Sequence, residues 1–410
     1  MGDFVPILTA VASGTFDSIE NVFINIARHI PLLNNVRRRK ELDQCLSGKV
    51  CIVTGANAGI GYATARKLAA RGAHVVLACR SEERGRQAAK ELSGLPPLPG
   101  CEPGQVEFAQ LDLCSLKNVR AFTKAFNRQG RRLDVLVCNA GIMSPANKLV
   151  TEDGLEMQFQ VNFLSHWLLA HELLSEQRKR RAKAAKKNHS SSSSKPNRKS
   201  SSSSSTALTT ASISGSSMQS SKAAAAAADA AACCSLEGTR LVMLSSLTHH
   251  AGSLQWGDKQ SANGYNPFTS YALSKICNII MAKEFQRRFD RHDSCRYGHD
   301  SAVAIHPGIV HTHLATGFFT QTGHSALPFM KALVAPILNG LYPLLLRTPE
   351  SSAEAMLIAA TAPAGKVAGR YMHNDRLSRP DKFAEEPARG VELWDLAVAL
   401  TGVATDASLA

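Results

Sequence analysis

The chain has 410 residues and a formal net charge of +14. The excess is uneven, because the segment from Arg178 to Lys222 holds eleven basic residues and no acidic one, and the remainder carries only about +3. The high charge is therefore no indication that a folded domain binds nucleic acid, although the basic segment could touch RNA, an anionic lipid or an acidic partner.

The ten cysteines are scattered, without a C-x-x-C pair or a histidine cluster at ligand spacing. The sequence therefore gives no support for a metal site. Thiols in apolar strands, as at Cys51, Cys79 and Cys138, are typical of a reducing compartment. We expect a cytoplasmic protein or one bound peripherally to an organelle membrane.

Residues 1–47 are predicted to form an N-terminal extension. Apolar residues recur at helical spacing from Ile19 to Ile30, and a basic run from Arg37 to Lys40 follows. No apolar stretch is long enough to span a bilayer, and a secretory signal is not indicated. Two interpretations stay open: an amphipathic helix on an anionic membrane, or an arm packed on its own domain.

A strand, a glycine-rich turn and a helix are predicted in that order after residue 48. The apolar run 49–53 precedes TGANAGIG, and a helical pattern follows at 62–69. Gly55, Gly59 and Gly61 allow a sharp turn whose backbone approaches a pyrophosphate at the helix N-terminus. A second strand at 74–79 supplies the βαβ context that such a motif requires.

The end of the second strand indicates which nicotinamide cofactor fits. An acidic residue there would bind the adenosine ribose and repel a 2′-phosphate. The strand instead ends in Cys79 and Arg80, and a guanidinium suits a phosphate. We expect NADP(H), with NAD(H) less favoured.

Tyr271 and Lys275 stand four residues apart in SYALSK, so on a helix both side chains share one face. A fixed cation beside a phenol stabilises the phenolate and lowers a pKa that is ordinarily about 10. Such a tyrosine can serve as a general acid or base.

These motifs, with others in the same order, resemble the short-chain dehydrogenase/reductase family, particularly its retinol dehydrogenase and WW-domain oxidoreductase branch. The resemblance runs from about Gly48 to Arg379. The further motifs are QLDL with Asp112, CNAG at 138–141, QVNF with Asn162, the pair Ser245 and Ser246, and PGIVHT at 307–312.

The resemblance implies catalytic roles for four residues. Tyr271 would protonate a carbonyl oxygen or deprotonate an alcohol, and Lys275 would lower its pKa and hold the ribose hydroxyls. Ser246 would hydrogen-bond the substrate oxygen, with Ser245 left open as a substitute. Asn162 would complete a tetrad and anchor a water-linked proton path, although an asparagine within a helix could equally bond backbone.

The resemblance also implies a set of residues that bind the cofactor. Asp112 and Asn139 would flank the adenine, and Thr312 the nicotinamide amide or the phosphates. The full set is Gly55, Asn57, Gly59, Ile60, Gly61, Arg80, Asp112, Leu113, Asn139, Ala140, Gly141, Tyr271, Lys275, Pro307, Gly308 and Thr312.

The predicted fold is one doubly wound Rossmann domain, a mainly parallel sheet with helices on both faces. Its two parts are residues 48–177 and 237–385. Between them, residues 178–236 have the composition of a disordered insertion, expected on the side away from the strand ends that bind cofactor. Residues 386–410 are predicted to be a C-terminal tail.

The stretch from Leu327 to Leu346 is the most apolar in the chain. In the resembled family this region is a mobile lid over the substrate, and its character here suits a lipophilic carbonyl or alcohol. Insertion into a membrane surface and a homodimer face stay open as alternatives. The doublet His249 and His250 is expected in a loop near the substrate mouth.

The sequence thus predicts an NADP(H)-dependent oxidoreductase that interconverts a carbonyl and an alcohol on a retinoid-, steroid- or lipid-like substrate. The alternative is a cofactor-binding regulatory or scaffold protein of the same fold, whose basic insertion contacts a partner or a membrane. The intact Ser246, Tyr271 and Lys275 favour the enzyme.

Overall fold

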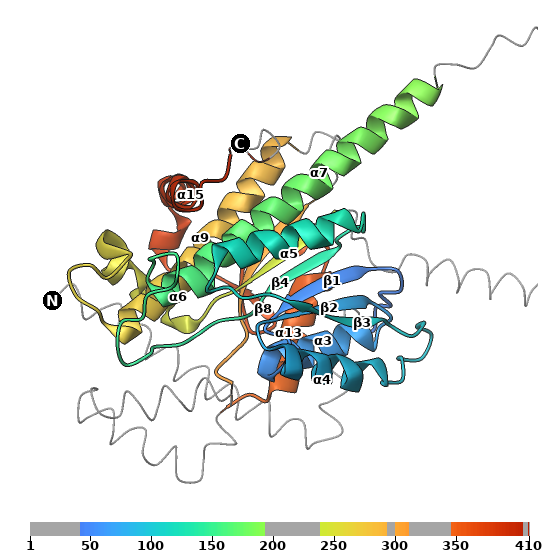
Figure 1. Ribbon diagram of the computed structural model, residues 1–410, viewed down its shortest axis with the longest axis horizontal. Helices are drawn as coiled ribbons and strands as arrows, with labels where there is room; N and C mark the ends of the chain where they lie inside the picture. The colour runs from blue at the N-terminus through green and yellow to red at the C-terminus, as the bar shows by residue number, and fades with distance from the viewer. Residues whose placement is uncertain (1–41, 193–237, 293–299, 311–345, 405–408, 410) are drawn as a thin grey trace, which may run out of the picture.

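The computed structural model describes residues 42–192, 238–292, 300–310, 346–404 and 409. These residues form one eight-stranded sheet with helices packed against it (Figure 1). The strand order is β3-β2-β1-β4-β5-β6-β7-β8, and neighbouring strands are parallel except for the antiparallel pair β7 and β8. The strands are β1 (Val50–Thr54), β2 (His74–Cys79), β3 (Val106–Gln110), β4 (Val135–Cys138), β5 (Arg240–Leu244), β6 (Ser301–His306), β7 (Tyr371–His373) and β8 (Arg376–Ser378).

The strand order reverses between β1 and β4. From β1 the chain extends the sheet through β2 to β3, and it then returns to build β4, β5 and β6 on the other side. In open parallel sheets ligands bind at such a switch point, beyond the carboxyl ends of the strands. The topology confirms the predicted doubly wound fold.

Helices cover both faces of the sheet, with α3, α4 and α13 on one face, α5, α7 and α9 on the other, and α15 packed outside α9 (Figure 1). The helical elements are α3 (Gly59–Ala69), α4 (Glu82–Ser93), α5 (Leu116–Arg128), α6 (Met157–Phe159), the π-helical turn η3 (Gln160–Leu164), α7 (Ser165–Ser192), the 3₁₀ segment η4 (Leu247–Asp258), α9 (Pro267–His292), α13 (Pro349–Thr361), α14 (Ala364–Val367), the 3₁₀ turn η6 (Lys382–Glu385) and α15 (Pro387–Thr401).

The central strands are apolar over most of their length because both faces of the sheet are buried. In β1, Ile52 packs into the core beneath α5, α7 and α9, whereas Cys51 and Val53 pack into the core beneath α3, α4 and α13. The strands β4 and β5 divide their side chains between the two cores in the same way.

Short polar residues begin several of the helices. The side chains of Ser81, Ser115 and Thr348 accept hydrogen bonds from the first turns of α4, α5 and α13. Each cap satisfies an amide that would otherwise have no partner within the helix. Helix α3, which follows the glycine turn, has no such side-chain cap.

The predicted boundary at residue 178 is wrong. Helix α7 continues to Ser192, and Arg178 is fully buried, with Nη1 2.7 Å from Asp300 Oδ2. Arg181 pairs with the same carboxylate at 2.6 Å. The low hydrophobicity after residue 177 concealed a helix that is fixed by ion pairs rather than by apolar contacts. Residues 193–237, the rest of the predicted insertion, lie outside the described residues.

The predicted C-terminal tail is likewise part of the domain. Helix α15 buries Leu393, Trp394 and Ala397, and the Trp394 ring lies 5.2 Å from that of Trp167 and 5.0 Å from that of Phe285. Strand β7, which follows α13 and α14, pairs in parallel with β6, and β8 adds an antiparallel edge. Residues 1–41 and 311–345, which include most of the N-terminal extension and of the apolar stretch, lie outside the described residues.

Candidate active site

Three of the four predicted catalytic residues meet at the carboxyl end of β5. Ser246 follows that strand and begins η4, while Tyr271 and Lys275 lie one turn apart near the start of α9. The Tyr271 hydroxyl is hydrogen-bonded to Ser246. Both Tyr271 and Lys275 are buried. The α9 helix therefore holds a phenol and an amine against the serine at the end of the neighbouring strand.

The two adjacent serines have different surroundings. Ser245 is buried, and its hydroxyl donates to the backbone carbonyl of Lys275 at 2.9 Å. Ser246 is partly exposed and faces the Tyr271 hydroxyl. Of the two, only Ser246 has the position that the predicted substrate contact requires.

Asn162 occupies the π-helical turn η3 before α7. Its Oδ1 accepts from Ile142 N at 2.8 Å, and its Nδ2 donates to Ile142 O and to Ser274 Oγ, each at 2.9 Å. The side chain thus ties the loop after β4 to α9, as expected for an asparagine that bonds backbone. Such π turns occur often at functional sites, and the role of Asn162 in a proton path stays a prediction.

Lys275 and Asn162 converge beside Gly141. A Cβ added at Gly141 would lie 3.0 Å from Asn162 Oδ1 and 3.6 Å from Lys275 Nζ. Lys275 Nζ itself donates to Leu244 O at 3.4 Å. A glycine at this position therefore keeps the space in front of both groups open.

Burial dominates the protonation of the tyrosine and the lysine. Burial raises the pKa of Tyr271, and the hydrogen bond with Ser246 offsets only part of this rise. Burial also lowers the pKa of Lys275 to about 8. Lys275 Nζ lies 5.3 Å from the centroid of the Tyr271 ring. In this arrangement burial keeps the pKa of Tyr271 above its ordinary value, and its lowering by Lys275 stays a prediction.

The glycine turn is built for close backbone packing. Gly55 has φ +65°, and a Cβ there would lie 3.0 Å from Ala140. Gly59 also has positive φ, at +56°. At Gly61 a Cβ would lie only 2.4 Å from Gly55 O and 2.5 Å from Asn139 Nδ2. The turn with Asn57 and Ile60 therefore presents backbone and an uncapped α3 N-terminus, which is the surface that a pyrophosphate requires.

Asn139 joins the ends of β1 and β4. Its Nδ2 donates to Thr54 O at 2.8 Å, and Thr54 Oγ1 accepts from the amides of Asn139 and Ala140, each at 2.9 Å. The side chain of Asn139 thus positions the floor of the predicted cofactor site, and its predicted contact with adenine stays a prediction.

Arg80 is exposed just beyond β2. Its guanidinium interacts with Cys114, which also lies beside Asp112. Asp112 Oδ1 accepts from Cys114 N at 2.9 Å, so this carboxylate shapes the turn after β3. The side chain of Leu113 is buried in the core, which leaves only its backbone for a cofactor.

The loop after β6 begins with Pro307 and Gly308. Pro307 O accepts from Ser352 Oγ at 2.9 Å, and Gly308 has φ +91°. A Cβ at Gly308 would lie 2.4 Å from Arg347 Cδ, so the close approach requires glycine. Thr312 lies outside the described residues.

The sequence did not assign a role to two buried histidines. His166 Nε2 lies 2.9 Å from Thr54 Oγ1, and its Nδ1 lies 3.1 Å from Asn162 O. His249 is not in a loop as expected: it is buried in η4, with Nδ1 2.7 Å from Ser246 O and Nε2 accepting from Asp381 N at 3.2 Å. The spacing of His166 four residues after Asn162 was a signal that could have indicated a shared helix face.

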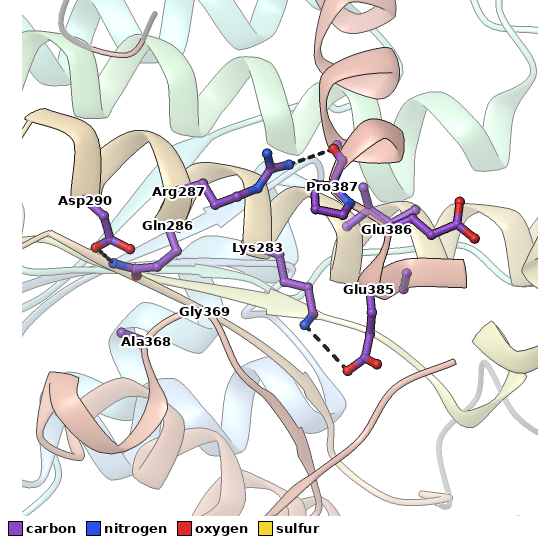
Figure 2. A pocket seen from close by; sticks show the side chains of 12 residues that line it. Lys283, Gln286, Arg287, Asp290, Ala368, Gly369, Glu385, Glu386 and Pro387 are labelled. Carbon is purple, nitrogen blue, oxygen red and sulfur yellow. Dashed lines mark hydrogen bonds and ion pairs between the residues drawn. The ribbon is translucent and has the colours of Figure 1, made fainter. Parts of the chain in front are cut away.

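A surface hollow of about 270 Å³ lies elsewhere, between α9, the turn before β7 and the start of α15 (Figure 2). Lys283 and Glu385 face each other there at 3.9 Å, and Arg287 donates to Pro387 O at 2.9 Å. None of the predicted catalytic or cofactor residues lines it. We therefore do not identify this hollow with the substrate site.

Neither a metal cluster nor a membrane-spanning helix is found in the described part of the chain. No group of three His, Cys, Asp or Glu side chains there is placed to hold a metal ion. No helix there combines the length and the apolar character of a membrane span.

Comparison with known proteins agrees with this geometry. A family model described as short chain dehydrogenase matches residues 49–198. Human retinol dehydrogenase 14 is 30% identical over 87% of this chain and 88% of its own length, and human retinol dehydrogenase 13 is 30% identical over 87% and 86%. The polyprenol dehydrogenase of Danio rerio is 29% identical over 87% and 88%.

Solved structures support the fold. An uncharacterised protein from Mycobacterium paratuberculosis superposes with a TM-score of 0.57 at 24% identity, covering 89% of this chain and 98% of its own. A short-chain type dehydrogenase/reductase from Mycobacterium marinum gives 0.51 at 18% identity, with 82% and 98% covered.

The fold, the site and these relatives together define an NAD(P)-dependent oxidoreductase that acts on CH–OH and C=O groups. The chain belongs to the short-chain dehydrogenase family, in its retinol dehydrogenase-like branch.

Proposed function

We propose that this protein is an NADP(H)-dependent oxidoreductase that interconverts the carbonyl and alcohol forms of a lipophilic substrate. One observation carries the cofactor preference: an exposed Arg80 directly follows β2, at the position where an acidic residue would disfavour a 2′-phosphate. A guanidinium at that position provides a fork of donors for a phosphate.

The residues present fit a nicotinamide dinucleotide. The backbone of the turn from Gly55 to Gly61 would receive the pyrophosphate, because its glycines leave no side chain in the way and α3 begins there without a cap. Lys275 and Gly141 would border the ribose and the ring. When bound, the nicotinamide supplies or accepts the hydride.

The proton chemistry falls to the tyrosine. In reduction, the Tyr271 hydroxyl would give its proton to the carbonyl oxygen while the Ser246 hydroxyl donates to the same oxygen. Because burial raises the pKa of Tyr271, its neutral, proton-donating form dominates over a wide pH range. Lys275 would then return a proton to the phenolate, for which a pKa of about 8 is suited.

The lipophilic character of the substrate rests on the names of the relatives and on the apolar sequence from Leu327 to Leu346. Retinol and polyprenol dehydrogenases are named for long apolar alcohols. Such substrates partition into bilayers, so the proposal includes peripheral membrane contact through the amphipathic pattern of residues 1–47. A homodimer and a cytoplasmic or organelle-surface location belong to the same proposal.

The test is a binding titration with NADPH and NADH, followed by turnover assays on aldehydes and ketones that include retinal and steroids. We expect Arg80→Ala to weaken NADPH by about 10- to 100-fold while NADH changes little. Arg86→Ala is the control, because Arg86 is exposed on α4 and pairs with Glu82 at 2.8 Å.

Equal losses for both cofactors would contradict phosphate recognition by Arg80. Tight NADPH binding without turnover of any carbonyl would instead favour the scaffold alternative.

A further inference from the structure

Three chain segments meet where β1, β2 and β3 begin, at the edge of the sheet opposite to the catalytic residues. Leu46 N donates to Arg71 O at 2.7 Å, and Leu98 N donates to Ala70 O at 2.7 Å. Glu102 N donates to Ser47 Oγ at 3.3 Å. The segment before β1 and the segment before β3 are therefore both held against the turn that precedes β2.

Each of the two outer segments brings a cysteine to this junction. Cys45 and Cys101 are both partly exposed, and their thiols are hydrogen-bonded to each other. The Cys45 sulfur also lies 3.1 Å from Ser47 Oγ and 3.5 Å from Arg71 O. Fifty-six positions separate the two thiols in the sequence, yet the fold places them in contact.

The surroundings favour the thiolate at Cys45. Burial raises the pKa of this thiol, but hydrogen bonds from the Ser47 and Cys101 side chains and from the amides of Ser47 and Glu102 outweigh it, and the pKa lies below its ordinary value. Cys101 also lies within electrostatic range of the Arg71 guanidinium. A low pKa combined with exposure is the usual character of a reactive cysteine.

Other described cysteines lack this combination. Cys51, Cys79, Cys138 and Cys277 are buried. Cys114 is partly exposed, but burial and the neighbouring Asp112 raise the pKa of its thiol. Oxidation should therefore be selective for the junction over these positions.

We propose that Cys45 and Cys101 form a reversible intramolecular disulfide when the protein meets a peroxide. The Cys45 thiolate attacks a peroxide oxygen, the O–O bond breaks and hydroxide leaves, which yields a sulfenic acid. The Cys101 sulfur then attacks the Cys45 sulfur, the S–O bond breaks and water leaves. Two thiols lose two electrons in total, and hydrogen peroxide is reduced to two waters. A dithiol reductant restores both thiols by exchange.

The disulfide would fasten the segment that precedes β1 to the segment that precedes β3, across the start of β2. Because these strands begin at the edge opposite to the catalytic residues, the crosslink is expected to change stability and the attachment of the N-terminal segment rather than turnover. Closing a loop of this length restricts the unfolded chain and thereby stabilises the fold.

The test uses the full-length protein treated with hydrogen peroxide, then alkylated and mapped by mass spectrometry without reduction. We expect a peptide pair joined through Cys45 and Cys101, which disappears after dithiothreitol treatment. Cys45 should be oxidised about ten times faster than Cys114. In Cys101→Ser, a dimedone adduct should accumulate at Cys45, whereas Cys114→Ser, the control, should still form the crosslink.

A thermal scan provides a second measurement. The oxidised protein should melt several degrees higher than the reduced protein, and Cys45→Ser should show no such difference. Failure to find the joined peptides at doses that oxidise Cys114, or pairing of Cys45 with any other cysteine, would overturn the proposal.

Discussion

At the scale of single residues, the hydroxyl of Tyr271 is the group whose removal should separate proton transfer from binding. Tyr271→Phe keeps the ring that packs in the site and deletes only the hydroxyl group, together with its transferable proton and its hydrogen bond with Ser246. We expect kcat to fall by at least about 10²- to 10⁴-fold with little change in the Kd for NADPH. Steady-state kinetics and a fluorescence titration measure the two quantities.

Tyr62→Phe is the matched control, because the Tyr62 hydroxyl donates to Glu91 at 3.0 Å rather than to a predicted catalytic residue. Turnover that survives in Tyr271→Phe at the level of this control would remove Tyr271 from the mechanism.

Two buried histidines should make the fold sensitive to mild acid. Burial lowers the pKa of His166 to about 4 and that of His249 to about 3, whereas an unfolded histidine titrates near 6.5. Between about pH 6 and pH 5 the unfolded chain therefore binds more protons than the native state, and stability falls as the pH falls. Each histidine should contribute about 1.4 kcal/mol per pH unit to that slope.

Urea unfolding at pH 5, 5.5 and 6 measures the slope, and His166→Gln and His249→Asn should each reduce it. A slope identical in both variants and the parent would mean that these groups do not remain neutral in the native state.

At the scale of the elements, the carboxylate of Asp300 holds α7 to the starts of two strands. It pairs with Arg178 and Arg181 and accepts from Thr239 N at 2.7 Å. Asp300→Ala would leave the buried Arg178 without its counter-charge, and we expect a loss of about 3–5 kcal/mol in the free energy of unfolding. Urea denaturation gives this value.

Asp290→Ala is the comparison, since Asp290 is exposed and bonds only Gln286 on its own helix among the contacts described. Asp300→Asn removes the charge but keeps the shape of the side chain, so it tests the contribution of the charge alone. Equal free energies of unfolding for Asp300→Ala and Asp290→Ala would show that the ion pairs of Asp300 do not stabilise the fold.

Helix α15 should behave as part of the core rather than as a tail. Trp394 contacts Trp167 and Phe285, and the guanidinium of Arg288 lies 3.9 Å from its ring centroid. We expect Trp394→Ala to cost about 3–5 kcal/mol. Val391→Ala, at an exposed position of the same helix, should cost little. A melting temperature unaffected by Trp394→Ala would contradict the packing.

At the scale of the whole molecule, the sequence was sufficient for the sheet and for much of the site. The glycine turn and the pair Tyr271 and Lys275 are local signals, and parallel strands bring their carboxyl ends to one edge. His166 contacts Thr54, His249 contacts Asp381, and Asp300 contacts Arg178. The partners in each pair are more than 100 positions apart in the sequence, so no local pattern predicts these contacts. The continuation of α7 was missed because charged and small residues formed a helix that tertiary ion pairs stabilise.

The carboxylate of Asp300 also binds the chain on both sides of the segment between Arg181 and Thr239. Arg181 and Thr239 are bound to one side chain, so the chain leaves the domain and returns to it at nearly the same point. That point lies at the starts of β5 and β6, across the sheet from Ser246 and Tyr271. A reporter domain inserted between Arg181 and Thr239 would therefore be attached at points that lie across the sheet from the catalytic residues, which makes this junction suitable for such an insertion.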